Sequence, residues 1–149
     1  MTADTDLGVG EVSPTDAHEL LRTDSHARLV DVRTQAEWEF VGVPDVSDLG
    51  QMLISVEWAS YPGMVRNADF ALQLEDAMGG TATGPVLFIC RSGARSLRAA
   101  ETFAAHMAAK GQNVRCLNVS EGFEGDRNVD RHRGHLSGWK ARGLPWQQS

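Results

Sequence analysis

The stretch PVLFICRSGARSLRAAETFAAHMAAKG, residues 85–111, joins a short apolar run to a long helical pattern. The run at 85–90 is apolar and is bounded by turn-forming residues, which is typical of an interior parallel strand buried on both faces. The pattern that follows predicts a helix from about Ala94 to Lys110, with Gly111 as its C-cap. A strand, a loop and a helix in this order form the building unit of an α/β fold.

The rest of the chain repeats this alternation. Further apolar runs predict strands at 27–33, 52–57 and 113–119, and a helix is predicted near 67–78, closed by paired glycines. Strands that alternate with helices in one domain predict a parallel sheet with helices on both faces. In the helix after residue 93, the face expected to be buried consists of Leu97, Ala100, Ala104, Met107 and Ala108.

Two helix starts can be located from their capping residues. Ser13 can cap a helix whose first position is Pro14, and Asp16 is favourable in its first turn. Thr34 and Glu37 have the spacing of a capping box, in which each side chain bonds the backbone of the other residue. One helix therefore begins ahead of the first predicted strand, and another begins directly after it.

The chain is predicted to form one domain, at residues 11–145. A length of 149 residues is enough to bury one core of ordinary size. Residues 1–10 are expected to be a mobile N-terminus, and residues 146–149 a short C-terminal tail. The segment 126–149 indicates an irregular basic loop followed by a short terminal helix.

The composition is typical of a soluble globular protein, with 42% hydrophobic and 23% charged residues. No run approaches the ~18 apolar residues of a membrane-spanning helix. The acidic start lacks the basic residues and apolar stretch of a signal peptide. A cytoplasmic location is therefore expected, with no membrane partner.

The net charge of −6 argues against nucleic acid as the main partner, because phosphate binding requires clustered cations. The charge is distributed unevenly. Residues 1–50 hold 11 acidic and 3 basic side chains, whereas residues 91–142 hold 10 basic and 5 acidic ones. The second half is locally cationic, which suits a small anionic ligand better than a polyanion.

The two cysteines differ in their surroundings. In a chain expected in the cytoplasm, both should be reduced thiols rather than a disulfide. Cys116 lies in the alternating apolar stretch at 113–119, where a buried structural cysteine is the simplest interpretation. Cys90 ends the apolar run at 85–90 and has no such simple explanation.

Cys90 is expected at the carboxyl edge of the sheet, where open α/β sheets bind their ligands. Loop amides and the positive end of a helix dipole stabilise a thiolate at such a position. The small residues of the loop let its backbone curl around the sulfur as an anion-binding nest, and two arginines add positive charge. The nucleophile is thus Cys90, and the candidate substrate-binding residues are Arg91, Ser92, Gly93, Ala94, Arg95 and Ser96.

Two motifs resemble those of a known family. CRSGARS, at 90–96, is similar to the active loop of rhodanese-type sulfurtransferases, and LVDVRTQAEWEF, at 29–40, looks like a second stretch of the same domains. The resemblance covers roughly residues 11–145. It implies a central parallel sheet of five strands flanked by helices on both faces.

The resemblance implies sulfur transfer without a cofactor or metal. The cysteine that matches Cys90 takes a sulfur atom from a donor such as thiosulfate and becomes a persulfide. A thiophilic acceptor (cyanide, a small thiol or a protein thiol) then removes that atom, which is two-step covalent catalysis. The residues that match Asp31, Arg33 and Glu37 hold the loop architecture through ion pairs and hydrogen bonds.

Three departures from the family pattern fall where the pocket walls are expected. Residues 41–46, with Gly42 to Asp45 at their centre, replace a Gly-His-Ile-Pro-Gly-Ala stretch. Glu121-Gly122 replaces paired glycines. The connection 47–70 is longer than in minimal members, and its Trp58, Tyr61 and Pro62 are candidates for a changed pocket wall.

Other functions are weighed against this one. Cysteine phosphatases and arsenate reductases also hold a thiolate among amides, but phosphatase loops place five residues between cysteine and arginine, whereas four separate Cys90 from Arg95. A non-catalytic module that carries sulfur or binds a partner also remains open. His132 and His135 have the spacing of a metal pair, but no third ligand is near, which favours a solvated basic loop.

Overall fold

The computed structural model describes residues 9–148. The helices are α1 (Pro14–Thr23), α2 (Gln35–Phe40), α3 (Phe70–Ala77) and α4 (Ala94–Ala108), with a 3-10 helix η1 (Ser47–Leu49). The strands are β1 (Val9–Val12), β2 (Arg28–Asp31), β3 (Val43–Pro44), β4 (Ile54–Ser55), β5 (Ala59–Ser60), β6 (Val65–Arg66), β7 (Val86–Ile89), β8 (Cys116–Val119) and β9 (Trp146–Gln147).

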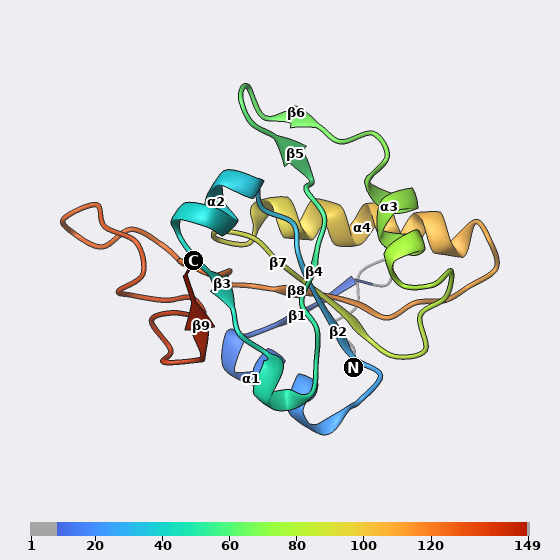
Figure 1. Ribbon diagram of the computed structural model, residues 1–149, viewed down its shortest axis with the longest axis horizontal. Helices are drawn as coiled ribbons and strands as arrows, with labels where there is room; N and C mark the ends of the chain where they lie inside the picture. Colours follow the sequence, from blue (N-terminus) through green and yellow to red (C-terminus); the bar gives the residue numbers. More distant parts are fainter. Residues whose placement is uncertain (1–8, 149) are drawn as a thin grey trace.

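A five-stranded sheet forms the centre of the structure (Figure 1), with the strand order β1-β8-β7-β2-β4. All four pairings in this sheet are parallel. The predicted α/β fold with a central parallel sheet is therefore confirmed. Since β7 is the middle strand and is buried along its whole length, the prediction of an interior strand is confirmed as well.

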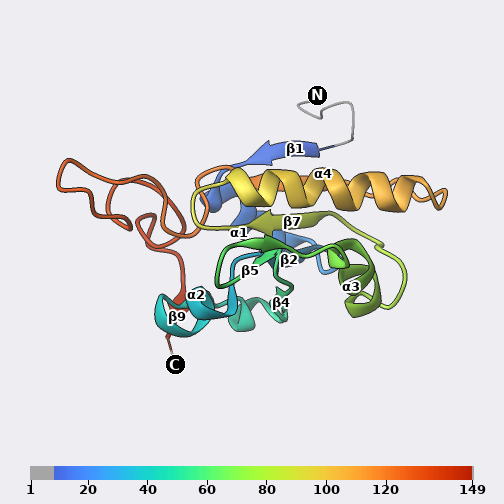
Figure 2. The same ribbon diagram turned by 90° about the horizontal axis from the view of Figure 1, so that it is seen from above.

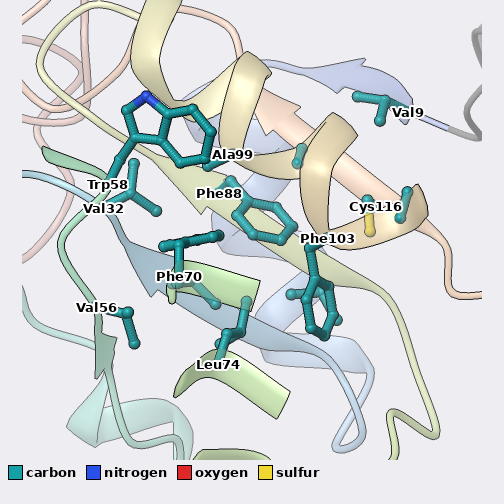
Figure 3. Packing of buried hydrophobic residues seen from close by; sticks show 14 of the residues in the cluster. Val9, Val32, Val56, Trp58, Phe70, Leu74, Phe88, Ala99, Phe103 and Cys116 are labelled. Atoms are coloured by element: carbon teal, nitrogen blue, oxygen red, sulfur yellow. The ribbon is translucent and has the colours of Figure 1, made fainter. Parts of the chain in front are cut away.

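The two faces of the sheet carry separate hydrophobic cores. On one face α3 and α4 pack against side chains such as Val30, Phe88 and Cys116. Figure 3 shows Phe88 of the sheet close to Phe103 of α4, with Phe70 and Trp58 nearby. On the other face α1 packs against alternate residues of the same strands, together with buried side chains from the C-terminal segment, including Phe123 and Trp139. Helices thus cover both faces, and burial of each large apolar side chain stabilises the fold by about 1.5–3 kcal/mol.

The predicted helix starts are present. The Ser13 hydroxyl accepts a hydrogen bond from the Asp16 amide at 3.1 Å, with Pro14 at the first position of α1. Thr34 and Glu37 form both bonds of the capping box at the start of α2. These local signals depend on neighbouring residues alone, which is why the sequence reveals them.

Other predictions need correction. Helix α4 ends at Ala108, which is exposed rather than buried, and its buried face includes Ala99 and Phe103 instead. Residues 1–8 of the N-terminus expected to be mobile lie outside the described residues. Val9 and Gly10, which were assigned to it, pair with Cys116 and Leu117 as part of β1.

The prediction of a short terminal helix is wrong. Residues 120–145 run as turns and loops that extend from one end of the sheet (Figure 2), and the chain then forms β9. Three glycines at positive φ, Gly134, Gly138 and Gly143, interrupt any helix in this segment. Trp146 and Gln147, assigned to a tail, pair with β3 in an antiparallel ladder.

Candidate active site

The loop at 90–96 connects the central strand β7 to α4, at the carboxyl edge of the parallel sheet. The Cys90 sulfur Sγ accepts hydrogen bonds from the backbone amides of Gly93 at 3.1 Å and Ser96 at 3.3 Å. The Ser96 hydroxyl lies 3.2 Å from the same sulfur. Cys90 is only 1% exposed. The loop therefore surrounds the sulfur with donors, as an anion-binding nest does.

The predicted loop residues differ in their places around the sulfur. Gly93 and Ser96 contact it directly. Ser92 is half-buried and Ala94 is exposed, and no hydrogen bond between either residue and the sulfur occurs in the part of the chain that the structure describes.

Gly93 is the N-cap of α4 and has a φ of 111°. A Cβ atom at this position would lie 2.5 Å from the Ser120 carbonyl oxygen, which follows β8. Both the left-handed conformation and the close approach require glycine. The tight turn aims the Gly93 amide at the sulfur.

A second segment, 122–125, holds the loop from outside. The Phe123 amide donates to the Cys90 carbonyl at 2.7 Å, and the amides of Glu124 and Gly125 donate to the Arg91 carbonyl at 2.9 and 3.0 Å. Gly122 lies against the loop so closely that a Cβ there would be 2.5 Å from the Arg91 oxygen. This glycine of the Glu121-Gly122 pair is thus a structural requirement of the loop.

The departures from the family pattern have structural roles. Glu121 accepts a hydrogen bond from the Gly138 amide at 2.8 Å and pairs with Arg142, so it fixes the C-terminal segment. A Cβ at Gly42 would lie 2.8 Å from the Gln147 oxygen, where β3 and β9 meet. Trp58 is 8% exposed and packs on Phe70.

A buried polar network behind the sulfur was missed by sequence reasoning. The Ser96 hydroxyl lies 2.5 Å from Asn118 Oδ1, and the Asn118 amide nitrogen donates to the Gly93 carbonyl at 3.2 Å and to the Glu11 carboxylate. Asn118 is 3% exposed and pairs directly with Glu11 across β8 and β1. Burial raises the pKa of Glu11, against the hydrogen bond from Asn118. The one sequence signal for this network was the amide side chain of Asn118, which lies within an otherwise apolar strand.

Arg95 forms a bidentate ion pair with Glu37, with distances of 2.8 and 2.9 Å between their nitrogen and oxygen atoms. Both side chains are 20% exposed. Burial alone would raise the pKa of Glu37, but hydrogen bonds from Arg95 and Thr34 lower it to about 2. Burial lowers the pKa of Arg95, but the hydrogen bonds and the charge of Glu37 raise it. The interaction with Cys90 raises the pKa of Arg95 as well. The cation near the sulfur is thus already paired.

The Asp31–Arg33 pair supports the same edge of the sheet. Both side chains are fully buried, and Arg33 Nη2 lies 2.7 Å from Asp31 Oδ2. The same nitrogen donates to the Gly42 carbonyl at 2.7 Å, and the guanidinium lies 4.4 Å from the centre of the Phe123 ring. These contacts connect β2 to the segments that hold the loop. Asp31, Arg33 and Glu37 therefore make the structural ion pairs that the resemblance implied.

Arg91 has a different environment from Arg95. It is exposed, and its guanidinium makes no hydrogen bond or ion pair with any residue from 9 to 148. It lines an open surface pocket of about 590 Å³ beside the loop. This pocket is lined by Thr34, Ala36, Glu37, Phe40, Val41, Tyr61, Met64, Arg91, Arg95, Glu124 and Arg133.

The remaining candidates from the sequence are Cys116 and the pair His132 and His135. Cys116 is fully buried, and burial raises the pKa of its thiol to about 12. The rings of His132 and His135 lie 6.2 Å apart. Among residues 9–148, no group of three or more His, Cys, Asp or Glu side chains could hold a metal ion. No helix in that range combines the length and apolar character needed to span a membrane.

A family model for the Rhodanese-like domain matches residues 13–141. The chain belongs to the rhodanese-like family. An uncharacterized protein of Rickettsia rickettsii, the RP600 homolog, is 35% identical over 141 residues, which are 95% of this chain and 99% of that protein. The resemblance that CRSGARS and LVDVRTQAEWEF indicated is therefore confirmed.

Two solved structures share this rhodanese fold. Rv0390 from M. tuberculosis has a TM-score of 0.79 and 42% sequence identity, over 93% of this chain and 97% of that chain. The homodimeric polysulfide-sulfur transferase from Wolinella succinogenes has a TM-score of 0.54 and 26% identity, over 99% of this chain and 82% of that chain. The rhodanese-like arrangement therefore extends over nearly the whole chain.

The Glu37–Arg95 pair predicts a pH-dependent stability. Because the pKa of Glu37 falls from 4.5 to about 2 on folding, its stabilisation is fully present above pH 4.5 and is lost as the pH falls toward 2. Glu37→Gln should lower the free energy of unfolding near pH 7 by roughly 2 kcal/mol, allowing for partial solvent exposure. The difference from the unchanged protein should narrow between pH 4.5 and 2 in urea titrations. A difference that stays constant over this range would contradict the assignment.

Proposed function

We propose that the chain is a sulfurtransferase that moves a sulfane sulfur from a small anionic donor such as thiosulfate, through a persulfide on Cys90, to a thiophilic acceptor. The observation that carries the proposal is the pair of backbone amides, Gly93 and Ser96, that donate to Cys90 Sγ. Donors fixed in advance around a sulfur stabilise its anionic form, which is the nucleophile.

In the first step the Cys90 thiolate attacks the outer sulfur of thiosulfate. A new bond forms between Cys90 Sγ and that sulfur, the sulfur–sulfur bond of thiosulfate breaks, and sulfite leaves with the electron pair. The two negative charges of thiosulfate leave as those of sulfite, and the single charge of the thiolate moves to the outer sulfur of the persulfide. In the second step the acceptor takes that sulfur and restores the thiolate, as two-step covalent catalysis requires.

The burial of Cys90 favours transfer of a single atom. Because the residue is 1% exposed, a substrate has to present a terminal atom to the sulfur rather than a bulky centre. The Arg95 guanidinium is paired with Glu37 at both nitrogens and is not free to close over a phosphate. Both observations favour sulfur transfer over the cysteine phosphatase alternative.

Membership in the rhodanese-like family and the similarity to a polysulfide-sulfur transferase support a sulfurtransferase-type function. The choice of thiosulfate, the persulfide on Cys90 and a cytoplasmic location are parts of our proposal. Within residues 91–96, we assign the anion nest to the backbone amides of Gly93 and Ser96. The proposed steps take place on the protein's own thiol and need no metal or nucleotide cofactor.

The two arginines of the loop should respond differently to substitution. Arg91→Ala removes an exposed, unpaired charge, so KM for thiosulfate should rise about threefold to fivefold with kcat retained. This effect should weaken as salt rises, because the Debye length is only ~10 Å at 0.1 M. Arg95→Ala leaves Glu37 without its partner and should lower kcat and thermal stability. Steady-state kinetics at low and high salt, with melting curves, test both. Equal effects of the two variants on KM alone would contradict this division.

Intact-mass measurement before and after thiosulfate treatment tests the proposed function directly. The protein should gain about 32 Da, one sulfur atom, and lose it again on addition of cyanide. A protein that is folded and reduced but gains no mass from thiosulfate or polysulfide would rule the proposal out.

A further inference from the structure

Exposed apolar side chains gather beside the loop that holds Cys90. Phe40, the last residue of α2, is 78% exposed, and Tyr61 and Met64 of the β5–β6 hairpin are 69% and 43% exposed. All three line the same surface pocket as Arg91. Figure 1 shows this hairpin projecting from the body of the molecule. A group of exposed apolar side chains is typical of a surface that binds another molecule.

The same pocket carries an excess of positive charge. The Arg95–Glu37 ion pair has no net charge. The other charged side chains of the pocket are two cations, Arg91 and Arg133, and one anion, Glu124. Arg133 is half-buried and uses Nη1 to donate to the Gly125 carbonyl at 2.6 Å. In a chain with a net charge of −6, a locally cationic surface favours an anionic partner.

The residue types are those of a protein interface. Aromatic residues, methionine and arginine are enriched at the centres of protein–protein interfaces, whereas lysine is depleted. The pocket has Phe40, Tyr61, Met64 and Arg91 and lacks lysine among its lining residues. It is also open to solvent, so a polypeptide would cover more of its apolar surface than a small molecule would.

We propose that the pocket between α2, the β5–β6 hairpin and the cysteine loop binds an acidic polypeptide, which presents a cysteine flanked by apolar side chains as the sulfur acceptor. This inference rests on the proposed function. Phe40, Tyr61 and Met64 contact the apolar flanks, and Arg91 and Arg133 face the acidic residues. Because Cys90 is 1% exposed, the acceptor cysteine enters on a projecting turn or chain end.

The transfer step balances without a further reagent. The acceptor thiolate forms a bond to the outer sulfur of the Cys90 persulfide, and the bond from that sulfur to Cys90 Sγ breaks. The electron pair of the broken bond remains on Cys90 as the thiolate. The transferred sulfur keeps the negative charge that it carried in the Cys90 persulfide, so that the acceptor becomes the persulfide.

The test measures discharge of the thiosulfate-loaded protein by four thiols in single turnovers. The probes are acetyl-Glu-Leu-Cys-Leu-Glu-amide, its Ser-for-Leu and Lys-for-Glu counterparts, and dithiothreitol. Each rate is normalised by the rate of the same thiol with a small symmetrical disulfide, which removes differences in intrinsic reactivity. The acidic apolar peptide should discharge the protein about tenfold faster than the other three.

Two variants assign the preference to the hairpin. A Tyr61→Ala, Met64→Ala double variant, loaded fully with sulfur before the assay, should lose the preference for the acidic apolar peptide. Met52→Ala is the matched control, because Met52 is 83% exposed and does not line this pocket. That variant should keep the preference.

The outcomes separate this inference from the proposed function. Failure of the unchanged protein to load sulfur would overturn both. Normal loading with equal normalised rates for all four thiols, or fastest discharge by dithiothreitol, would overturn only the acidic polypeptide acceptor. A preference that survives in the double variant, or disappears equally in Met52→Ala, would overturn the assignment to the hairpin.

Discussion

Replacing Cys90 with serine is expected to abolish persulfide formation completely. The serine hydroxyl is protonated at neutral pH and cannot replace a thiolate as the nucleophile toward sulfur. Mass spectrometry of the thiosulfate-treated variant should show no gain of about 32 Da. The fold should persist, because the loop is held by backbone hydrogen bonds to the Cys90 and Arg91 carbonyls, which serine retains.

The second cysteine is the control for this experiment. Cys116→Ser should load sulfur normally, because Cys116 is fully buried and burial raises the pKa of its thiol to about 12. Its thiol therefore stays protonated and inaccessible at neutral pH. A mass gain on the Cys90→Ser protein, or its loss in a folded Cys116→Ser protein, would overturn the assignment of the nucleophile.

The parts of the site that the sequence predicts are those built from neighbouring residues. Cys90, Gly93 and the start of α4 follow one another, and a glycine loop between a buried strand and a helix has few possible shapes. The Thr34–Glu37 capping box is equally local. Because such features depend on short-range contacts, they can be recognised before the fold is known.

The parts that the sequence did not predict depend on residues far apart in the chain. Glu37 and Arg95 are 58 positions apart, and Glu11 and Asn118 are 107 positions apart. Arg95 was expected to attract the donor, because its partner could not be seen in the motif itself. The alternating pattern at 113–119 predicted a strand, but not that Asn118 would reach toward the loop. Such contacts form only when the complete fold brings distant strands and helices together.

The largest expected effect away from the thiol comes from Gly122. This residue has a φ of 70°, and an added Cβ would lie 2.5 Å from the Arg91 oxygen and 2.6 Å from the Ser92 nitrogen. Those atoms belong to the backbone of the cysteine loop. They cannot shift away from the added Cβ without also moving the amides around Cys90. Gly122→Ala should therefore slow persulfide formation about 100-fold, since misplacement by about 1 Å can have this effect. It should also lower the free energy of unfolding by about 3 kcal/mol.

The matched control separates backbone strain from displacement of the loop. Gly111 has a φ of 82°, and a Cβ there meets no atom within 4 Å. Gly111→Ala should therefore cost about 1 kcal/mol through its left-handed conformation alone, and persulfide formation should keep its rate. Stopped-flow measurement of persulfide formation, with urea titrations of both variants, tests the comparison. If Gly122→Ala forms the persulfide at the rate of Gly111→Ala, contact between Gly122 and the loop does not position the thiol. If it is slow while still folded, the segment that follows β8 is part of the catalytic framework, because it holds the loop amides in register with the sulfur.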